Sequence, residues 1–193
     1  MRLKTLLVIV ALAICVASAP ATFAQNLLTN GSFETGDYTG WTEGGNFEFS
    51  QVVSGAFYDY SGAQQGTYYS TMGPVGSDGT LSQSFSDQMG QQYLVGFWFA
   101  SVGDDPSDFS VKWDNTTLLS LTNPDTGANW TYYSYYVTGT GNDTLSFAFR
   151  DDPAYVALDN VIVSATIPEP SSLMLLGTGV LGLGGIVRRK LRR

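Results

Sequence analysis

The sequence predicts an all-β fold, an antiparallel β-sandwich or barrel, over residues 25–166, and three observations support this prediction. Short apolar or alternating runs are interrupted by Gly, Asn, Asp or Pro every eight to twelve residues. No stretch shows a helical period, and β-branched and aromatic residues are abundant. This pattern is typical of an antiparallel sandwich or barrel. We expect nine or ten strands around one core, which a domain of this length can bury.

Three segments illustrate the predicted strands. In "DFSVKWDNTTLLSL", residues 108–121, apolar and polar side chains alternate until Asp114-Asn115, which favours a turn and therefore a hairpin. "TLSFAFR", residues 144–150, places three apolar side chains on one face. "YLVGFWFA", residues 93–100, is apolar on both faces. We expect this last strand to lie in the middle of a sheet, under cover.

Two strands are preceded by the same signal, "DDPSDF" from Asp104 and "DDPAYV" from Asp151. A residue before proline is pushed towards extended geometry, so both segments are predicted to be loops that lead into strands. One interpretation is a pair of acidic clusters that serve a single site. The favoured interpretation is two solvated entry loops, because loops of acidic proteins are usually acidic themselves.

The first 24 residues have the layout of a secretory signal peptide. Two basic residues precede the apolar run 6–17, and small residues follow it. Cleavage is expected after Ala24, with Ala21 as the alternative. The apolar run is too short to span a bilayer comfortably.

The segment between the two chain ends is strongly acidic. Between positions 25 and 167, Lys112 and Arg150 are the only basic residues, against sixteen acidic ones, which gives a net charge of about −14. Such a surface repels phosphate backbones, so no nucleic-acid partner is expected. Neutral polymers and divalent cations suit it better.

Composition also restricts the chemistry of the predicted exported body. The chain has no His, and its single cysteine, Cys15, lies in the predicted signal peptide. Ser–His–Asp triads, Cys–His pairs and His-bound zinc are therefore excluded. A glycoside hydrolase would need two partly buried carboxylates roughly 5–9.5 Å apart. The acidic residues instead lie mostly beside Gly, Asn or Pro in predicted loops, so we expect a protein that is not an enzyme, with no catalytic residues.

The C-terminal 27 residues form a second sorting segment. Residues 171–187 carry no charge, yet seventeen residues reach only about 25 Å as a helix, and five glycines weaken the segment further. Pro168-Glu169-Pro170 precedes it and stays extended. The basic residues that follow act as a stop-transfer signal; they are Arg188, Arg189, Lys190, Arg192 and Arg193.

Together, the motif, the short span and the basic end of residues 167–193 resemble the PEP-CTERM sorting signal, also described as an ice-binding protein C-terminal domain. The resemblance implies recognition by exosortase, a membrane-embedded cysteine peptidase, and cleavage near Pro168-Glu169-Pro170. It implies transient contact with the inner membrane through residues 171–187, followed by a location at the cell surface or outside the cell. A plain C-terminal membrane anchor is the alternative. The ice-binding label comes with the tail and implies nothing about residues 25–166.

The body itself resembles jelly-roll carbohydrate-binding modules with the galactose-binding-like fold. The resemblance rests on "NLLTNGSFETGDYTGWT", residues 26–42, and on "YVALDNVIVSA", residues 155–165. It implies a structural calcium held by Glu34 and Asp159, the only cofactor that we expect. The apolar alternation of the last strand shifts at Asp159-Asn160, which predicts a β-bulge that re-aims a side chain. Alternatively, Asp159 only hydrogen-bonds a turn and Glu34 is solvated.

Three aromatic residues of "WTYYSYYV" are candidates for stacking on sugar rings. If Tyr133 and Tyr135 face inward, then Trp130, Tyr132 and Tyr136 line the other face of the strand, where a flat ring with a polar edge suits a glycan. Packing against a neighbouring loop is the competing interpretation.

We therefore expect a non-catalytic, exported protein associated with exopolysaccharide. A purely structural surface protein and, less favoured, a carboxylate-dependent glycoside hydrolase are the alternatives.

Overall fold

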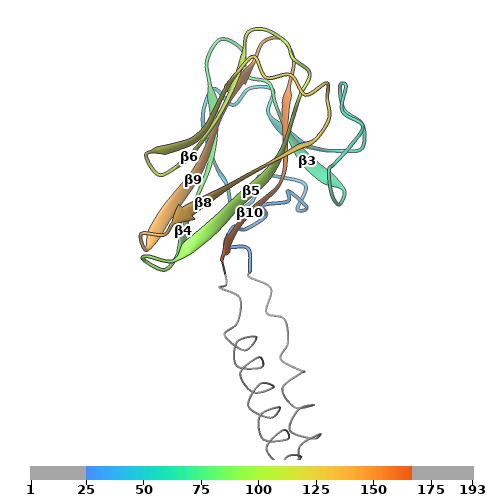
Figure 1. Ribbon diagram of the computed structural model, residues 1–193. Helices are drawn as coiled ribbons and strands as arrows, with labels where there is room; N and C mark the ends of the chain where they lie inside the picture. The colour runs from blue at the N-terminus through green and yellow to red at the C-terminus, as the bar shows by residue number, and fades with distance from the viewer. Residues whose placement is uncertain (1–24, 167–193) are drawn as a thin grey trace, which may run out of the picture.

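The computed structural model describes residues 25–166, which form ten β-strands in two facing antiparallel sheets (Figure 1). No helix occurs among these residues, and the predicted all-β sandwich is confirmed. The strands are β1 Thr42–Gly45, β2 Gln51–Ser54, β3 Tyr68–Met72, β4 Gly79–Ser86, β5 Gln92–Ser101, β6 Ser107–Trp113, β7 Thr116–Thr122, β8 Thr131–Thr138, β9 Asn142–Asp151 and β10 Val156–Ala165.

Each sheet has five strands and mixes early and late parts of the chain. The first sheet has the order β1-β4-β9-β6-β7, and the second has the order β2-β3-β10-β5-β8. Only β6-β7 and β2-β3 are hairpins of consecutive strands. Every other connection between consecutive strands crosses from one sheet to the other, as in a jelly roll. In the stretch 25–166, no helix is long and apolar enough to cross a membrane.

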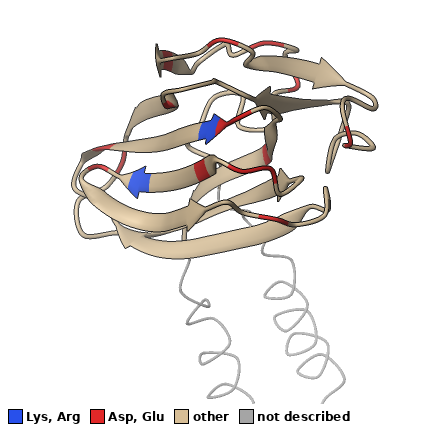
Figure 2. Ribbon diagram, turned by 90° about the horizontal axis from the view of Figure 1, so that it is seen from above, with Lys and Arg blue, Asp and Glu red and all other residues tan. Residues whose placement is uncertain are grey.

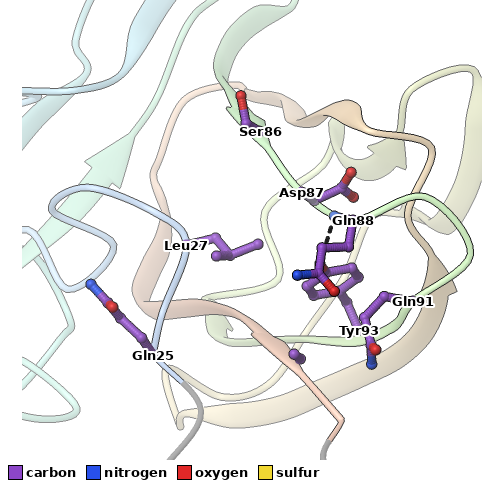
Figure 3. Close-up of a pocket in the computed structure, with 8 residues that line it drawn as sticks. Gln25, Leu27, Ser86, Asp87, Gln88, Gln91 and Tyr93 are labelled. Atoms are coloured by element: carbon purple, nitrogen blue, oxygen red, sulfur yellow. Dashed lines mark hydrogen bonds between the residues drawn. The ribbon is translucent and has the colours of Figure 1, made fainter.

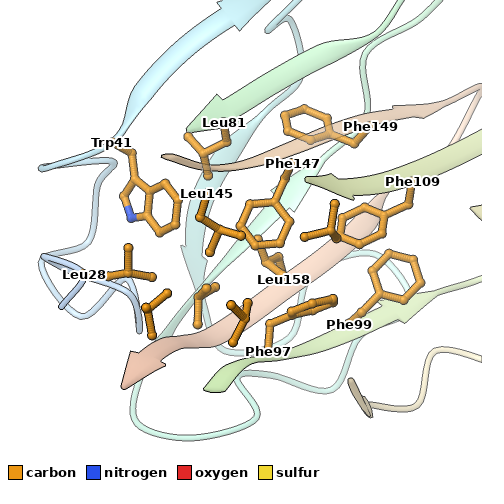
Figure 4. Close-up of a cluster of buried hydrophobic side chains, with 14 of the residues drawn as sticks. Leu28, Trp41, Leu81, Phe97, Phe99, Phe109, Leu145, Phe147, Phe149 and Leu158 are labelled. Atoms are coloured by element: carbon orange, nitrogen blue, oxygen red, sulfur yellow. The ribbon is translucent and has the colours of Figure 1, made fainter. Parts of the chain in front are cut away.

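The core between the sheets is built from aromatic rings (Figure 4). The alternation in β6 and β9 buries every second side chain, as predicted, so Phe109 and Phe147 are fully buried. From the opposite sheet, Phe97 meets Phe147 edge to face at 5.5 Å, and Phe99 lies 4.3 Å from Phe109 between ring centroids. Contacts of this kind between the sheets are what hold the two layers together.

The predicted hairpin is present. β6 and β7 pair antiparallel and are joined by a turn at Asp114-Asn115. Asp114 adopts the left-handed region with φ of 50°, which Asp tolerates better than most residues. The adjoining shift in register between Val111 and Lys112 marks a bulge in the same hairpin.

The expectation that β5 is covered on both faces is wrong for half of its length. Its inward side chains are buried, but on the outer face Leu94 and Trp98 are only partly covered. The loop 55–66 covers the other half, where Tyr60, Tyr69, Ala100 and Ala157 form a second small hydrophobic cluster. A single loop of this length is too short to cover the whole outer face of the sheet.

The predicted bulge in β10 is confirmed. Between Asp159 and Ile162 the register against β5 shifts by one residue, and Asn160 has a positive φ of 49°. The extra residue lets both Leu158 and Val161 point into the core, while Asp159 points outward into a buried position under the loop 55–66. The bulge therefore changes the face on which the strand places its side chains.

The N-terminal segment packs on this bulge. Asn26 donates through Nδ2 to the Val161 carbonyl at 2.9 Å, and its Oδ1 accepts the N–H groups of Val163 at 2.8 Å and Leu28 at 3.1 Å. The Val161 N–H donates to the Gly31 carbonyl at 2.8 Å. A Cβ on Gly31 would lie 2.1 Å from the Val161 carbonyl oxygen, so only glycine fits there.

Asn26→Ala should therefore destabilise the protein. It removes three side-chain hydrogen bonds and leaves the Val163 N–H without its acceptor, which costs about 1–3 kcal/mol in free energy of unfolding. Urea denaturation of the purified protein measures the loss. Asn129→Ala is the matched control, because Asn129 is exposed and bonds only to Thr126 and Gly127 beside it. Equal stability of the two variants would contradict this role of Asn26.

Candidate functional site

An exposed group of apolar side chains lies on the outer face of the second sheet. We call this group, Leu94, Trp98, Tyr132, Tyr136 and Ile162, the aromatic face. Strand pairing places Tyr136 opposite Leu94 and Tyr132 opposite Trp98, with Ile162 on the neighbouring strand. Tyr132 is 43% exposed and Tyr136 is 68% exposed.

Tyr132 lies across its neighbouring strand. Its ring centroid is 5.2 Å from that of Trp98, and a Cβ built on Gly96 would lie 2.3 Å from the Tyr132 hydroxyl. Glycine at position 96 therefore leaves room for the ring to lie over β5. Two neighbouring aromatic rings on an open sheet form a surface on which a flat ligand can stack.

Trp130 is not part of this face. Its indole Nε1 donates to the Gly62 carbonyl at 3.1 Å, and its ring contacts Tyr60 and Tyr69 beneath the loop 55–66. For Trp130, packing against a neighbouring loop is the observed arrangement. Of the three aromatic residues singled out from the sequence, the structure leaves Tyr132 and Tyr136 accessible together. Trp98 joins them, although the sequence suggested that it was covered.

The outer face of the first sheet is different in kind. One row across the sheet consists of Thr80, Ala148, Ser110 and Ser120, in register from strand to strand. Lys112 and Arg150 lie on the neighbouring strands β6 and β9, whereas acidic residues lie mostly at strand ends and in loops (Figure 2). This face presents hydroxyl groups and charges, and none of its strands carries a large exposed aromatic side chain.

A cavity of about 280 Å³ adjoins the aromatic face at the open edge between β7 and β8. Tyr136 and Thr138 line it from β8, and Trp113, Asp114 and Leu118 line it from the β6-β7 hairpin. Trp113 is 5% exposed, and its indole Nε1 is buried without a hydrogen-bond partner among the described residues. The cavity therefore combines an open aromatic ring with an unused hydrogen-bond donor.

A second cavity, of about 400 Å³, lies at the end of the sandwich where the described chain begins and ends (Figure 3). Gln25, Leu27 and Ala165 line it together with the segment 86–93. The Gln88 N–H donates to the Tyr93 hydroxyl at 2.9 Å and so holds this turn against β5.

Asp159 and Glu34, the residues expected to hold calcium, bind consecutive parts of one loop. Asp159 is fully buried, and its Oδ2 accepts the N–H groups of Gln64 at 2.8 Å and Gln65 at 3.2 Å. Glu34 accepts the N–H groups of Thr67 at 2.8 Å and Tyr68 at 2.9 Å through one oxygen, Oε1. The two carboxylates therefore hold the last part of the loop and the start of β3, residues 64–68.

The chemistry of this pair fits a cation. Burial, with a smaller contribution from the charge of Glu34, raises the pKa of Asp159 to about 6. The side-chain oxygen of Gln64, whose main-chain N–H binds this carboxylate, is buried and has no hydrogen-bond partner among the described residues. Carboxylate and amide oxygens are ligands that calcium prefers. Asp159 also hydrogen-bonds a turn, as the alternative interpretation states, and this does not prevent it from binding a metal.

The two Asp-Asp-Pro segments, expected to be loops that lead into strands, lie side by side. Ser107 at the start of β6 pairs with Asp151 at the end of β9, so both loops occupy the same end of the sandwich. The Asp152 N–H donates to the Pro106 carbonyl at 3.0 Å and joins the two loops directly. The repeated motif was the only sequence signal for this convergence. The pairing of β6 with β9 that brings the loops together could not be read from the sequence, and a single site formed by both loops stays a prediction.

The sorting residues Pro168, Glu169 and Pro170, the basic residues 188–193 and the predicted membrane segment 171–187 lie outside the described residues. The same holds for the predicted signal peptide.

Residues 166–193 match the model of the PEP-CTERM protein-sorting motif. The match confirms the resemblance of the tail. A tail of this kind implies an exported protein that reaches the cell surface through the membrane and is processed by exosortase. Comparison with curated protein sequences finds no match for the chain.

The described body is similar in structure to carbohydrate-binding modules. TmCBM61, solved in complex with β-1,4-galactotriose, has a TM-score of 0.60 and 19% identity, with 74% of this chain and 100% of that chain covered. The CBM22-1 xylan-binding domain of Paenibacillus barcinonensis Xyn10C has a TM-score of 0.51 and 18% identity, with coverage of 77% and 99%.

A similar structure with another kind of ligand is a cyclase from Fischerella sp. TAU in complex with 4-(1H-indol-3-yl)butan-2-one. Its TM-score is 0.55 at 16% identity, with 76% of this chain and 100% of that chain covered. At these identities the similarity establishes the fold. The chain therefore combines a carbohydrate-binding-module-like jelly-roll body with a PEP-CTERM sorting motif.

Proposed function

We propose that this protein is an exported, non-catalytic glycan-binding protein that associates with exopolysaccharide through the aromatic face. The observation that carries the proposal is the open pair Trp98 and Tyr132, continued by the highly exposed Tyr136 on the same strand. A folded protein of this size rarely leaves large aromatic side chains together at its surface unless they bind something.

The neighbouring cavity adds polar groups to this stacking surface. A sugar that stacks on Tyr136 can use Thr138 and Asp114, which line the same cavity, as hydrogen-bond partners. The net charge of about −14 between residues 25 and 167 opposes polyanions. A neutral or cation-bridged polysaccharide is therefore the favoured ligand.

The neighbouring carboxylates Asp87 and Asp143 do not suit glycoside hydrolysis. Asp143 raises the pKa of Asp87, after burial, which is the larger cause, and Asp87 Oδ1 accepts the Gly141 N–H at 2.6 Å. Asp143 is fully buried and accepts the N–H of Thr140 at 2.8 Å. It has no path to a substrate, which supports the proposal that the protein is not an enzyme.

The finer steps of sorting also belong to the proposal. Residues 171–187 hold the exported chain briefly in the inner membrane, and exosortase cuts near Pro168-Glu169-Pro170. The body is then released or passed to the extracellular matrix. The short, glycine-rich span suits this temporary role, because it is a weak anchor.

Changing Pro168, Glu169 and Pro170 to alanine should block removal of the tail and leave export intact. The variant should accumulate in the membrane at its full length after signal-peptide cleavage, as seen by immunoblotting of cell fractions. Changing Ser171 and Ser172 to alanine, just beyond the motif, is the control and should leave processing normal. Trimming and release of the triple variant at the wild-type rate would overturn the sorting proposal.

We also propose a structural calcium at Glu34, Asp159 and the Gln64 side chain. Binding to the folded state alone stabilises it by about 2.7 kcal/mol at a hundredfold excess over Kd. Calcium should therefore raise the Tm, and Glu34→Gln should reduce the rise, because it removes one of the two carboxylates. Glu48→Gln, which changes an exposed glutamate, is the matched control.

Magnesium at the same concentration separates specific binding from screening of the acidic surface. Scanning calorimetry in chelator and in excess calcium provides the measurement. A Tm that responds equally to the two metals, or a Glu34→Gln variant with the full calcium response, would remove this site from the proposal.

Tyr132→Ala and Tyr136→Ala should each weaken glycan binding. The loss of one stacking contact is worth about 0.5–1.5 kcal/mol, which corresponds to roughly a two- to twelvefold increase in Kd. Affinity electrophoresis in polysaccharide from the protein's own host measures this change. Tyr58→Ala is the matched control, because Tyr58 is 54% exposed but packs against Tyr155, away from the aromatic face.

Wild-type binding is expected to be weak, in the micromolar to millimolar range of a shallow site (roughly −4 to −8 kcal/mol). Both tyrosine variants should keep the wild-type Tm. If the wild-type protein binds no glycan of its host, the purely structural alternative is correct. Release of reducing sugar during the assay would instead indicate a hydrolase.

A further inference from the structure

Asp151 is a buried carboxylate with no partner. It is the last residue of β9, its exposed fraction is 0%, and neither Oδ1 nor Oδ2 has a hydrogen-bond partner among the described residues. A buried ionised carboxylate costs several kcal/mol unless another group compensates its charge. Such a group in a native structure indicates a bound proton, water or ion.

The side chains around Asp151 add negative charge and do not compensate it. Asp104, from the other Asp-Asp-Pro loop, and Asp152 both raise the pKa of Asp151, after burial, which is the larger cause. The main-chain N–H of Ala154 offsets part of the rise, and the resulting pKa is about 7. Asp152 also has a buried oxygen, Oδ1, without a hydrogen-bond partner in the described part of the chain.

The nearby basic residue is engaged elsewhere. Arg150 Nε lies 3.2 Å from Oδ2 of Asp152, the oxygen that also accepts the Gly76 N–H at 3.0 Å. Tyr60 is close enough for the charge of Asp151 to raise its pKa, after burial as the first cause, but its hydroxyl donates to the Tyr155 carbonyl. Neither group therefore neutralises Asp151.

We propose that the paired Asp-Asp-Pro loops bind a hard divalent cation, calcium in an extracellular setting, with Asp151 and Asp104 as its carboxylate ligands. Calcium takes six to eight oxygen ligands. Within residues 25–166 no three acidic side chains converge on one point, so main-chain carbonyls and water complete the shell. A site with so few carboxylates suits the affinity of extracellular modules, with Kd of roughly 10⁻⁴–10⁻³ M.

This site is separate from the Glu34–Asp159 pair. The loops 102–106 and 152–155 occupy the end of the sandwich opposite Gln25 and Thr166, because β5 and β10 run the full length between these ends. The two sites share no residue, and the new site does not depend on glycan binding.

The test measures calcium bound to the purified full-length chain in nonionic detergent by equilibrium dialysis. A Glu34→Gln, Asp159→Asn background, which removes both carboxylates of the other proposed site, isolates the new site. There, Asp151→Asn should remove the remaining bound calcium, and Asp104→Asn should weaken its binding at least tenfold. Asp105→Asn, which makes the same charge change at an exposed position of the same loop, is the matched control and should bind like its parent.

A pH series separates a bound cation from a bound proton. The folded-state pKa of Asp151, about 7, lies above its ordinary value of 3.8, so the folded state holds the extra proton between these values. In chelator, and in the same background, which also removes the raised pKa of Asp159, the Tm should therefore fall as pH rises from about 4 towards 7. Calcium should restore the Tm at about pH 8. The Asp151→Asn variant should show neither the fall in Tm with pH nor its restoration by calcium.

If Asp151→Asn and Asp104→Asn bind as much calcium as their Glu34→Gln, Asp159→Asn parent, the proposal is wrong. It is also wrong if the Tm falls with pH in chelator but calcium fails to restore it at high pH, since Asp151 is then a buried acid that binds only a proton. If Asp151→Asn does not fold, the Asp104→Asn affinity decides, because Asp104 lies in a loop and is less buried.

Discussion

The bulge in β10 is the constraint on which the rest of the body depends. One extra residue at Asn160 lets the strand place Leu158 and Val161 in the core and Asp159 on the outside. The main chain at Val161 then forms hydrogen bonds with Gly31 and Asn26 of the N-terminal segment. Residue 31 lies so close to the Val161 carbonyl that only glycine fits there. Without the bulge, the loop 55–66 would lose its anchor on Asp159, and the second hydrophobic cluster would lose its cover.

This arrangement gives the two outer faces different properties. The loop that Asp159 holds covers one half of the second sheet, and the other half keeps its rings open to solvent. The first sheet carries hydroxyl groups and the two basic residues of the body instead. Recognition by stacking is therefore restricted to a small area, which lies beside the cavity that contains the unpartnered indole of Trp113.

Patterns that are local in the chain could be predicted from the sequence. Alternation identified the buried side of β6 and β9, the turn at Asp114-Asn115 identified a hairpin, and a shift in alternation identified the bulge. Contacts between distant segments could not be predicted. Trp130 and Tyr132 belong to the same strand region, yet only the position of the loop 55–66 decides which is covered. The convergence of Asp104 with Asp151 likewise depends on which strands pair, and a sequence motif carries no information on pairing.

The two ends of the body lie together, since the Leu27 N–H donates to the Val163 carbonyl at 2.8 Å and the Thr166 N–H to the Gln92 carbonyl at 2.9 Å (Figure 1). A module whose chain enters and leaves at one point can be inserted into another polypeptide without stretching its host. The same body can therefore serve as a transferable unit, placed within a loop of an unrelated surface protein or repeated in tandem, while the Asp-Asp-Pro loops at its far end remain accessible.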